Sequence, residues 1–540
     1  MLRESFKYKI LLIVVTAAVF FFHLDVLYIN LMETRNMLSA REMITSNHWI
    51  LTTMNDLPRY EKPPLPTWIT AVFGYIFGFE NFNGLRLPAS FISLLTILVL
   101  FDFTKLLKIS LRQSFICALI LATGFYMIFS GRTNQWDIYT HGFMLVSIYF
   151  FFQFLQNKQI WKNIVLAGIF CGFSFMSKGP VSLYALFLPF LLSYALVFKF
   201  KYLKEKIIPL LLFVFISFIV GGWWFIYVRI ADPDAFVKAL QIESSRWGNY
   251  NVRPFYYYWS FFVQSGIWTI PAFVSLLFPY LKNKVSNRKV YVFALLWTLF
   301  SVFLLSLIPE KKARYLLPVL IPLAITTSFY IEYLFRKFKE LSIKETAVLY
   351  FYHGLISLVC LVFPIAGWII LQPQGTDWIW FILISSSLLG AGIGIIINLK
   401  RKNYPPLFYL NIFIICAIIT FGFGFVKQFY KNPLANNISA LKQQSDQENF
   451  PVYEFGIFEP RIIWEYGEAI PNIDPENPVF PEEKYFGIIF QDKDMQALEE
   501  LIDDYDIIRE ERFDNNFTAP DQSSYRDRLI RNFFLLKKRK

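Results

Sequence analysis

Residues 199–230 have the sequence KFKYLKEKIIPLLLFVFISFIVGGWWFIYVRI, in which four lysines are followed by an almost entirely apolar run over 206–228. A run of about 20 apolar residues is long enough to cross the roughly 30 Å hydrocarbon core of a bilayer as a helix. The same arrangement, an apolar run bounded by a loop rich in lysine or arginine, recurs along the chain. The sequence therefore predicts an α-helical polytopic membrane protein.

The composition supports this fold class. The 540 residues are 56% hydrophobic and 17% charged, and their mean hydropathy is +0.44; such values exclude an ordinary soluble globular protein. The formal net charge of +12 could suggest nucleic-acid binding. However, the basic residues occupy short loops between apolar runs, where anionic lipid headgroups and membrane topology account for them. We therefore expect membrane lipids as partners and no nucleic acid.

The basic residues form six clusters that fall on one side when the apolar runs are threaded through a membrane. The clusters are Lys105/Lys108/Arg112, Lys158/Lys162, Lys199/Lys201/Lys204/Lys206, Lys282/Lys284/Arg288/Lys289, Arg336/Lys337/Lys339/Lys344 and Lys400/Arg401/Lys402. Short loops that carry such clusters lie in the cytoplasm. The remaining loops then lie outside, and they carry most of the unusual polar residues.

We expect about thirteen transmembrane helices. They are placed at 9–30, 86–106, 113–130, 137–156, 162–177, 180–199, 206–228, 257–281, 289–308, 314–335, 346–370, 377–398 and 406–427. The odd number puts the N-terminus in the cytoplasm and the C-terminus outside. The apolar run 65–79 is expected to be a surface or re-entrant helix, because counting it as a span would move every basic cluster outside.

The tail has a different composition and is expected to be a separate domain. Residues 1–427 form the predicted transmembrane domain, with a first outer loop at 31–85, and residues 428–540 form a small α/β domain on the outer, periplasmic side. PVYEFGIF, KYFGIIF and DIIREERF have strand patterns, and DKDMQALEELIDDY has helical periodicity. The basic and aromatic segment 525–540 is expected to lie on the membrane.

The first outer loop is rich in charged side chains. Its segment METRNMLSAREM (32–43) brings Glu33, Arg35, Arg41 and Glu42 together just after a span, where one helical face presents carboxylate and guanidinium groups. An interfacial helix whose charges simply face water explains the pattern equally well. In RYEKPP (59–64) the two prolines restrict the backbone beside Lys62. A fixed ammonium can hold a phosphate, although a snorkelling lysine is the alternative.

Three further outer segments carry candidate site residues. Asp137 follows GRTNQW at the mouth of a span, where a carboxylate is costly and usually functional. Lys178 lies before a Gly-Pro break in FMSKGP and either binds a lipid-linked phosphate or anchors a helix end. PEKKARYLLP places Lys311, Lys312 and Arg314 outside, against the positive-inside rule, which suggests an anionic ligand.

The outer loop ESSRWGNYNVRPFYYYW (243–259) combines Arg246 and Arg253 with Trp247 and four tyrosines. Aromatic faces stack on sugar rings and arginines bind phosphate, so this loop is a candidate acceptor or substrate surface together with Arg41. Interfacial aromatic residues have the same pattern. The four histidines are dispersed and show no metal-ligand spacing.

These segments, taken in order over residues 20–320, resemble the ArnT/PMT-related group of lipid-dependent glycosyltransferases of the GT-C class. The matching elements are ETRNMLSAREM, NHWILTTMNDLPRYEKPPLPTW, GRTNQWD, SKGP, the outer arginine and aromatic loop, and KKARYLLPVLIP. Each motif alone is weak, whereas the ordered set is specific. The group includes the transferase of 4-amino-4-deoxy-arabinose to lipid A and relatives of protein O-mannosyltransferases.

The resemblance implies a sugar donor carried on undecaprenyl phosphate and transfer at the periplasmic face of a bacterial inner membrane. It implies that Lys62, Lys178 and Arg59 bind the donor phosphate and that Arg314 and Tyr315 line the donor site. Asp137 matches the second acidic position of the family, and Glu33 matches its first-loop carboxylate. The acceptor is lipid A, another glycan or glycolipid, or a protein.

Two positions depart from the family pattern. The first-loop motif often begins Asp-Glu, whereas here it is Met32-Glu33, so Glu33, or Asp25 about two turns earlier, must supply the carboxylate. Some members bind a divalent metal through the glutamate at the Glu61 position and a later histidine. The corresponding loop here, NYNVRP, contains no histidine, so the resemblance gives little support to a metal at Glu61, and no cofactor is required.

Polyprenyl phosphate is a good leaving group, so the predicted enzyme must neutralise the departing phosphate and position the acceptor oxygen. Direct attack would invert the anomeric centre, with Glu33 or Asp137 orienting or deprotonating the acceptor. The rival class is a polyprenyl-linked sugar transporter or flippase, which would show interrupted inverted repeats or polar residues deep in several spans. A non-catalytic lipid-binding scaffold would leave the acidic residues without a role.

Overall fold

The computed structural model describes residues 2–200, 204–430 and 432–539, apart from the side chains of residues 2 and 246–248. The chain divides into two compact units. The first comprises residues 1–26 and 60–424, and the second comprises residues 27–59 and 425–540. Each unit has its own core and is described separately.

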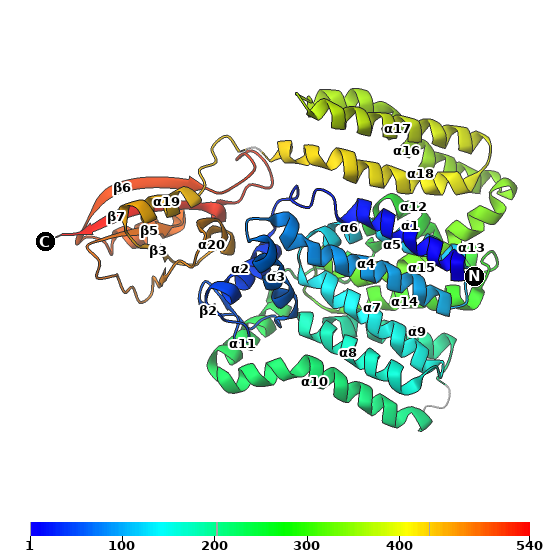
Figure 1. The fold of residues 1–540 in the computed structure, drawn as a ribbon, viewed down its shortest axis with the longest axis horizontal. Coiled ribbons are helices and arrows are strands. Elements are labelled where there is room, and N and C mark those ends of the chain that lie inside the picture. The colour runs from blue at the N-terminus through cyan, green and yellow to red at the C-terminus, as the bar shows by residue number, and fades with distance from the viewer. Residues whose placement is uncertain (1, 201–203, 431, 540) are drawn as a thin grey trace. The chain divides into compact units, whose positions relative to one another are not determined.

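The first unit is helical (Figure 1). Its α-helices are α1 (Leu2–Phe20), α3 (Leu65–Phe77), α4 (Phe82–Leu106), α5 (Leu111–Ala122), α6 (Phe125–Arg132), α7 (Trp136–Leu155), α8 (Ile160–Lys178), α9 (Leu188–Val197), α10 (Ile207–Ala231), α11 (Pro233–Asn249), α12 (Thr269–Ser275), α13 (Phe278–Leu281), α14 (Arg288–Leu307), α15 (Leu317–Lys337), α16 (Ile343–Leu371), α17 (Asp377–Lys400) and α18 (Tyr404–Ala417). The π-helical and 3₁₀ segments are η1 (Leu183–Phe187), η2 (Lys204–Lys206), η3 (Phe255–Tyr258), η4 (Phe261–Trp268), η5 (Ala313–Leu316), η6 (Phe338–Glu340) and η7 (Ile418–Gly422), and the 3₁₀ segment η8 (Phe423–Phe429) runs on into the second unit.

Side-chain caps set the starts of several helices. The side chain of Asn81 accepts a hydrogen bond from the Gly84 N–H (3.1 Å) at the start of α4. Ser110 caps α5 and Asn287 caps α14 in the same way. A polar side chain at this position satisfies an N–H group that has no partner within the helix, which matters most where no water is available. The sequence therefore fixes these helix starts locally.

Nine helices in the described part of the chain are long and apolar enough to cross a membrane, and the bent pair α5 and α6 would make a tenth. These ten coincide with ten of the thirteen expected spans. The other three expected segments are shorter or broken. Helix α1 has four charged residues among its first eight and ends at Phe20, residues 183–197 form a short apolar helix, and 257–281 contains η3, η4, α12 and α13. Gly266, at φ +65°, interrupts this last segment.

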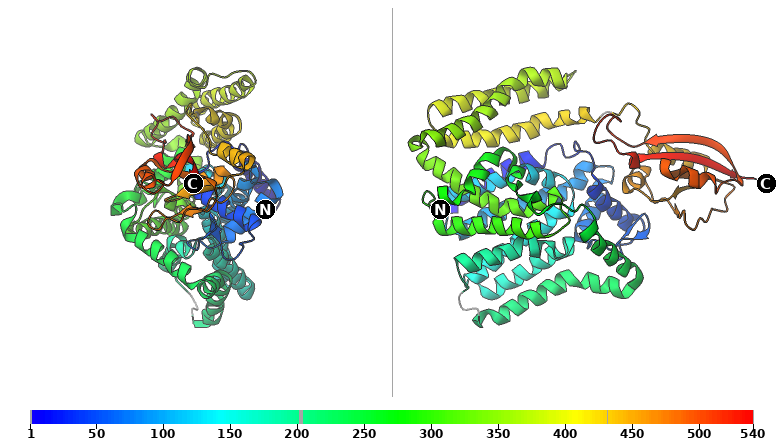
Figure 2. Two further views of the ribbon diagram at one scale, coloured as in Figure 1. Left: turned by 90° about the vertical axis from the view of Figure 1, so that its left-hand side faces the viewer. Right: turned by 180° about the vertical axis from the view of Figure 1, so that it is seen from behind.

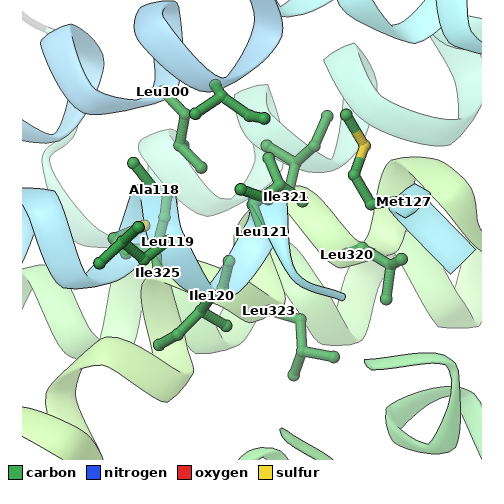
Figure 3. Close-up of a cluster of buried hydrophobic side chains, with 14 of the residues drawn as sticks. Leu100, Ala118, Leu119, Ile120, Leu121, Met127, Leu320, Ile321, Leu323 and Ile325 are labelled. Carbon is green, nitrogen blue, oxygen red and sulfur yellow. The ribbon is translucent and has the colours of Figure 1, made fainter. Parts of the chain in front are cut away.

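Helix α15 lies at the centre of the first unit. All but the last three of its residues are buried, and it packs against α5, α12 and α14. Figure 3 shows Leu320, Ile321 and Leu323 of α15 beside Leu121 of α5. The buried hydroxyls of this helix bond to its own carbonyls, as Thr326 does to Pro322 O (2.9 Å), so the apolar core holds polar side chains at little cost. Helices α16, α17 and α18 pack as successive neighbours (Figure 2).

Two buried arginines hold the chain that leaves α1. The guanidinium of Arg132 donates to Val19 O (2.7 Å), Phe22 O (2.5 Å) and His23 O (2.8 Å). Arg86 donates to Leu24 O (2.5 Å). The last carbonyls of a helix have no partner within it, and cations are favoured at that end. The arginines thus terminate α1 and fix the position of the α6–α7 turn, because Arg132 ends α6.

The second unit contains a five-stranded mixed sheet with strand order β4-β3-β5-β7-β6. Its strands are β3 (Val452–Phe455), β4 (Asn472–Ile473), β5 (Tyr485–Phe490), β6 (Tyr505–Asp514) and β7 (Ile530–Lys538), and its helices are α2 (Leu31–Thr45), α19 (Ser439–Glu448), α20 (Pro460–Tyr466) and α21 (Met495–Glu499), with 3₁₀ turns η9 (Asp492–Asp494) and η10 (Asp527–Leu529). The hairpin strands β1 (Thr53–Met54) and β2 (Leu57–Pro58) follow α2. Strand β3 is parallel to β4 and β5, whereas β7 is antiparallel to β5 and β6.

The three expected strands of the tail are confirmed as β3, β5 and β6, and the expected helix is reduced to the 3₁₀ turn η9 and the short α21. The expectation that the segment 525–540 lies on the membrane is wrong for residues 530–538. They form β7, which lies between two other strands and is buried along most of its length. Residues 533–536 of β7 are consecutive apolar residues, a pattern typical of a strand covered on both faces.

Replacement of Arg132 by leucine should destabilise the protein, because the Val19 and Phe22 carbonyl groups lose the Arg132 donor and the His23 carbonyl keeps only the hydrogen bond from the Val26 N–H (3.3 Å). We expect the free energy of unfolding to fall by roughly 3 kcal/mol or more, seen as a lower midpoint of thermal unfolding in detergent. The control Arg288→Leu removes an exposed arginine at the start of α14 and should leave the midpoint nearly unchanged. Equal midpoints for Arg132→Leu and the unmodified protein would contradict this role.

Candidate active site

The first unit contains an ion pair at one end of two adjacent helices. Asp137 lies in the first turn of α7 and Lys178 is the last residue of α8. The Lys178 Nζ lies 2.5 Å from the Asp137 Oδ1, and both side chains are 6% exposed. A carboxylate is favoured at a helix N-terminus and an ammonium at a helix C-terminus. The two helix ends therefore stabilise the charges that the two side chains carry.

Local sequence explains why Lys178 is presented there. The residue that follows it, Gly179, has φ +72°, a left-handed conformation that ends α8 and that glycine adopts without strain. Pro180 then prevents the helix from continuing. The lysine is thus the final side chain of a helix whose neighbour, α7, begins at the same level.

A second cation acts on the same carboxylate. Arg314 and Tyr315 lie in η5, and the charges of Lys178 and Arg314 both interact with Asp137. The Lys178 Nζ is 5.1 Å from the centroid of the Tyr315 ring, and the Arg314 guanidinium carbon is 5.6 Å from it. Two cations around one buried carboxylate leave one positive charge in excess. Such a cluster is suited to an anion.

Lys62 forms a separate ion pair within the first unit. Its Nζ lies 3.2 Å from the Glu243 Oε1 of α11. The adjacent Tyr60 donates a hydrogen bond to Asp232 Oδ2 (2.9 Å), and burial, with this contact to Asp232, raises the pKa of the Tyr60 phenol. The segment that carries Lys62 is therefore fastened to α11 and the residue before it. The charge of Lys62 also acts on Lys178, which makes it a third cation of the site.

Sequence analysis did not identify Glu243 as a site residue, because residues 229–256 were expected to form a loop. The structure places α11 there, beginning at Pro233 directly after Asp232. The Asp232 side chain accepts a hydrogen bond from the Ala235 N–H (3.3 Å). An aspartate followed by proline is a common helix start, and this pattern was the available signal.

The basic residues at 311–314 make different contacts. Lys311 is 4% exposed, and its Nζ donates to the carbonyls of Ile308 (2.6 Å) and Arg253 (3.0 Å), which holds the two chain segments together. Lys312 pairs with Glu310 (2.5 Å). Binding of an anionic ligand was expected for the whole cluster. It therefore stays a prediction for Arg314, whereas Lys311 holds chain segments together.

Tyr258 connects η3 to the same segment. Its hydroxyl donates to Lys312 O (3.1 Å) and accepts from the Lys312 N–H (2.9 Å). The Glu310 Oε1 also accepts a hydrogen bond from Tyr315 (3.2 Å). Together these contacts fix η5 and orient the ring that faces Lys178.

The remaining predicted residues have contacts of their own. Glu33 is buried in the second unit and forms a capping box with Asn30 at the start of α2. Arg41 donates to Ile463 O (2.9 Å) and Trp464 O (3.1 Å) at the end of α20. Arg59 donates to Ser39 Oγ (3.2 Å). Roles for Glu33, Arg41 and Arg59 in catalysis or substrate binding stay predictions.

Glu42 has a structural task in the same unit. It accepts hydrogen bonds from Thr53 Oγ1 (2.6 Å) and the Asn55 N–H (2.6 Å), which holds the turn between β1 and β2. Burial raises the pKa of the Glu42 carboxyl despite these bonds. Of the two arginines of the aromatic loop, Arg253 is exposed, whereas the side chain of Arg246 lies outside the described residues.

The metal site predicted at Glu61 stays a prediction for the described residues. Within them, no group of three or more His, Cys, Asp or Glu side chains is arranged to hold an ion. Glu61, the predicted ligand, is half-buried.

Comparisons with known proteins agree with the resemblance in the sequence. Residues 61–224 match the family described as dolichyl-phosphate-mannose-protein mannosyltransferase. The undecaprenyl phosphate-alpha-4-amino-4-deoxy-L-arabinose arabinosyl transferase of Serratia proteamaculans is 24% identical over 75% of this chain and 74% of its own. A transferase of the same name from Pseudomonas fluorescens is 25% identical over 61% of this chain, and the chain spans 60% of its length.

The fold is also shared with a solved structure. The crystal structure of ArnT from Cupriavidus metallidurans bound to undecaprenyl phosphate has a TM-score of 0.69 with 16% identity, and the match covers 97% of both chains. The apo structure of the same protein has a TM-score of 0.68. The predicted relationship to ArnT and the PMT group is confirmed, and the chain has the ArnT fold.

A double-mutant cycle should reveal the coupling between Asp137 and Lys178. Asp137→Asn leaves buried cations without their carboxylate and should lower the free energy of unfolding by roughly 3–5 kcal/mol. Asp137→Asn combined with Lys178→Met should cost less than the sum of the single changes, since the second change removes one unpaired charge. The measurement is the unfolding free energy of the four proteins in detergent, and strictly additive effects would contradict the ion pair.

Proposed function

We propose that this chain, whose residues 61–224 match the dolichyl-phosphate-mannose-protein mannosyltransferase family, is a membrane glycosyltransferase that uses a polyprenyl-phosphate sugar donor. The donor carrier is undecaprenyl phosphate, as named for the arabinosyl transferases to which the chain is similar. The observation that carries the proposal is the cluster of Lys178 and Arg314 around Asp137, with its excess positive charge.

The cluster suits the chemistry of the donor. During transfer the bond between the anomeric carbon and the phosphate oxygen breaks, and negative charge grows on the departing phosphate. Cations held in place before the reaction stabilise that charge without reorganisation. Lys178 and Arg314 supply two such cations and Lys62 a third, and the contacts of Asp137, Tyr315 and Glu243 set their positions.

The acceptor oxygen attacks the anomeric carbon as the phosphate leaves, and this single displacement inverts the anomeric centre. Its proton passes to a carboxylate, for which Glu33 and Asp137 are the candidates. Asp137 is paired with Lys178 and would act mainly by holding that lysine, whereas Glu33 caps a helix in the other unit. A phosphate acceptor would need little help from a base. The acceptor is lipid A, another glycan or glycolipid, or a protein.

The proposed topology places the reaction at the periplasmic face of a bacterial inner membrane. The N-terminus then lies in the cytoplasm and the domain from residue 428 lies in the periplasm, with thirteen crossings if the three shorter or broken segments are included. The six basic loops fall on one common side of the membrane, which supports this orientation through the positive-inside rule. The Asp137–Lys178 ion pair then lies at the periplasmic ends of α7 and α8.

Replacement of either Lys178 or Lys62 by alanine should lower turnover by roughly 10²–10³-fold, because a preorganised donor to the departing phosphate is lost. The assay uses the purified full chain, a panel of synthetic polyprenyl-phosphate sugars and a cell-envelope acceptor extract, and it measures the release of free polyprenyl phosphate.

Two matched controls accompany this assay. Lys162→Ala removes an exposed lysine from the other end of α8, and Lys238→Ala removes one from α11; both should keep turnover near that of the unmodified protein. Wild-type turnover in both Lys62→Ala and Lys178→Ala would overturn the assignment. If no donor is cleaved while labelled lipid crosses liposomes that contain the protein, the chain is a flippase.

A further inference from the structure

The first unit has a cavity of about 480 Å³ at the helix ends remote from Asp137 and Lys178. The lining residues come from the ends of α4, α7, α9 and α14, from η2, and from the loops beside them. They are Leu106, Leu107, Lys108, Phe152, Leu155, Gln156, Asn157, Tyr194, Phe198, Lys199, Lys206, Asn287, Lys289 and Val290. The volume is within the roughly 300–1,000 Å³ of small-molecule sites.

Helix α7 connects this cavity to the candidate active site. It begins at Trp136, next to Asp137, and ends at Leu155, which lines the cavity, so it contains 20 residues. At a rise of about 1.5 Å per residue the helix is roughly 30 Å long, which equals the thickness of a bilayer core. In the orientation proposed above, the cavity therefore lies at the cytoplasmic face.

Four lysines and no acidic residue line the cavity. Within the described part of the chain, Lys108, Lys199 and Lys289 are exposed and make no ion pair. They come from three of the six basic clusters, which are far apart in the sequence. Lysines that follow the positive-inside rule do not ordinarily bind one shared ligand. These three lysines, however, line the same cavity, together with the side-chain amides of Asn157 and Asn287.

The fourth lysine, Lys206, and three aromatic side chains that line the cavity are held in place by contacts within the fold. Lys206 is 5% exposed, and its Nζ donates to Leu155 O (2.9 Å) at the end of α7. The Tyr194 and Phe198 rings lie 5.3 Å apart, and Phe152 packs against both. The Lys289 Nζ is 5.0 Å from the Phe198 ring centroid. The cationic groups are thus mounted on a packed apolar wall.

We propose that this cavity binds the phosphate headgroup of an anionic phospholipid of the cytoplasmic leaflet. The lysines would bind the phosphate, and the Leu106, Phe152 and Val290 side of the lining would contact the first part of the acyl chains. The apolar half of the lining favours a lipid over free phosphate, and the cytoplasmic leaflet is the one rich in anionic headgroups. The inference does not depend on glycosyl transfer, only on the proposed orientation.

The test is lipid retention by the purified full chain in detergent, measured by native mass spectrometry with phosphatidylglycerol, phosphatidylcholine or inorganic phosphate. The cavity variant Lys108→Gln/Lys199→Gln/Lys289→Gln is compared with Lys162→Gln/Lys339→Gln/Lys344→Gln. The second variant removes the same charge from exposed lysines that do not line the cavity. Tryptophan-fluorescence unfolding establishes that both variants are folded, and Lys289→Gln alone serves if the triple variant is not.

The expected result is selective retention of phosphatidylglycerol by the unmodified protein and the surface variant, with an apparent affinity roughly tenfold or more lower in the cavity variant. A smaller loss of phosphatidylglycerol affinity in Lys289→Gln alone, in proportion to the one lysine removed, would also support the site. Equal retention by all variants, or equal retention of phosphatidylcholine, would overturn the proposal. Saturation of the cavity by inorganic phosphate with no preference for the lipid would overturn the lipid assignment.

Discussion

A carboxylate and an ammonium buried at the ends of two adjacent helices, Asp137 of α7 and Lys178 of α8, are the constraint on which the site depends. Each charge lies at the helix end that favours it, and each would be costly to bury alone. The pair keeps Lys178 against the Tyr315 ring and under the influence of Arg314. The positive charge that remains after Asp137 is neutralised is the property that a departing phosphate requires.

Lysine and arginine residues that have similar sequence contexts make different contacts in the structure. Arg86, Arg132 and Lys311 donate to backbone carbonyls and hold chain segments in place. Lys178 and Lys62 are held by carboxylates instead. In a setting with little water every carbonyl at a helix end needs a donor, so many outer basic residues serve the fold. A phosphate site must be sought among the cations that are not used in this way.

The sequence predicted the parts of this molecule that follow from local patterns. Long apolar runs identified ten of the membrane-length segments, and Gly179 with Pro180 marked the break that makes Lys178 the last residue of α8. Strand β7 was not predicted, because its apolar and basic sequence does not indicate that it pairs with β5 and β6, which lie elsewhere in the chain.

Site contacts between distant segments were harder to anticipate. The pairing of Lys62 with Glu243 needs α11, a helix whose start at Asp232 and Pro233 was overlooked. The clamp that Lys311 makes across residues 253 and 308 depends on tertiary packing alone. Residues 257–281 were expected to form one helix, but the helix is interrupted at Gly266, which has a positive φ. Glycine can adopt a positive φ but also occurs inside regular helices, so the presence of Gly266 in the sequence does not predict the interruption.

The two ends of α7 now have distinct chemistry. One end carries a paired carboxylate among cations, and the other opens on a lysine-lined cavity with an aromatic wall. At the first end, the proposed function requires that one uncompensated positive charge, centred on Arg314 and Lys178, selects a lipid phosphate. The most direct test compares the affinity of the purified protein for undecaprenyl phosphate with its affinity for undecaprenol, before and after Arg314→Gln. The account predicts that the phosphate is preferred by roughly tenfold or more and that Arg314→Gln removes most of that preference; an undiminished preference in the variant, or none in the unmodified protein, would contradict it.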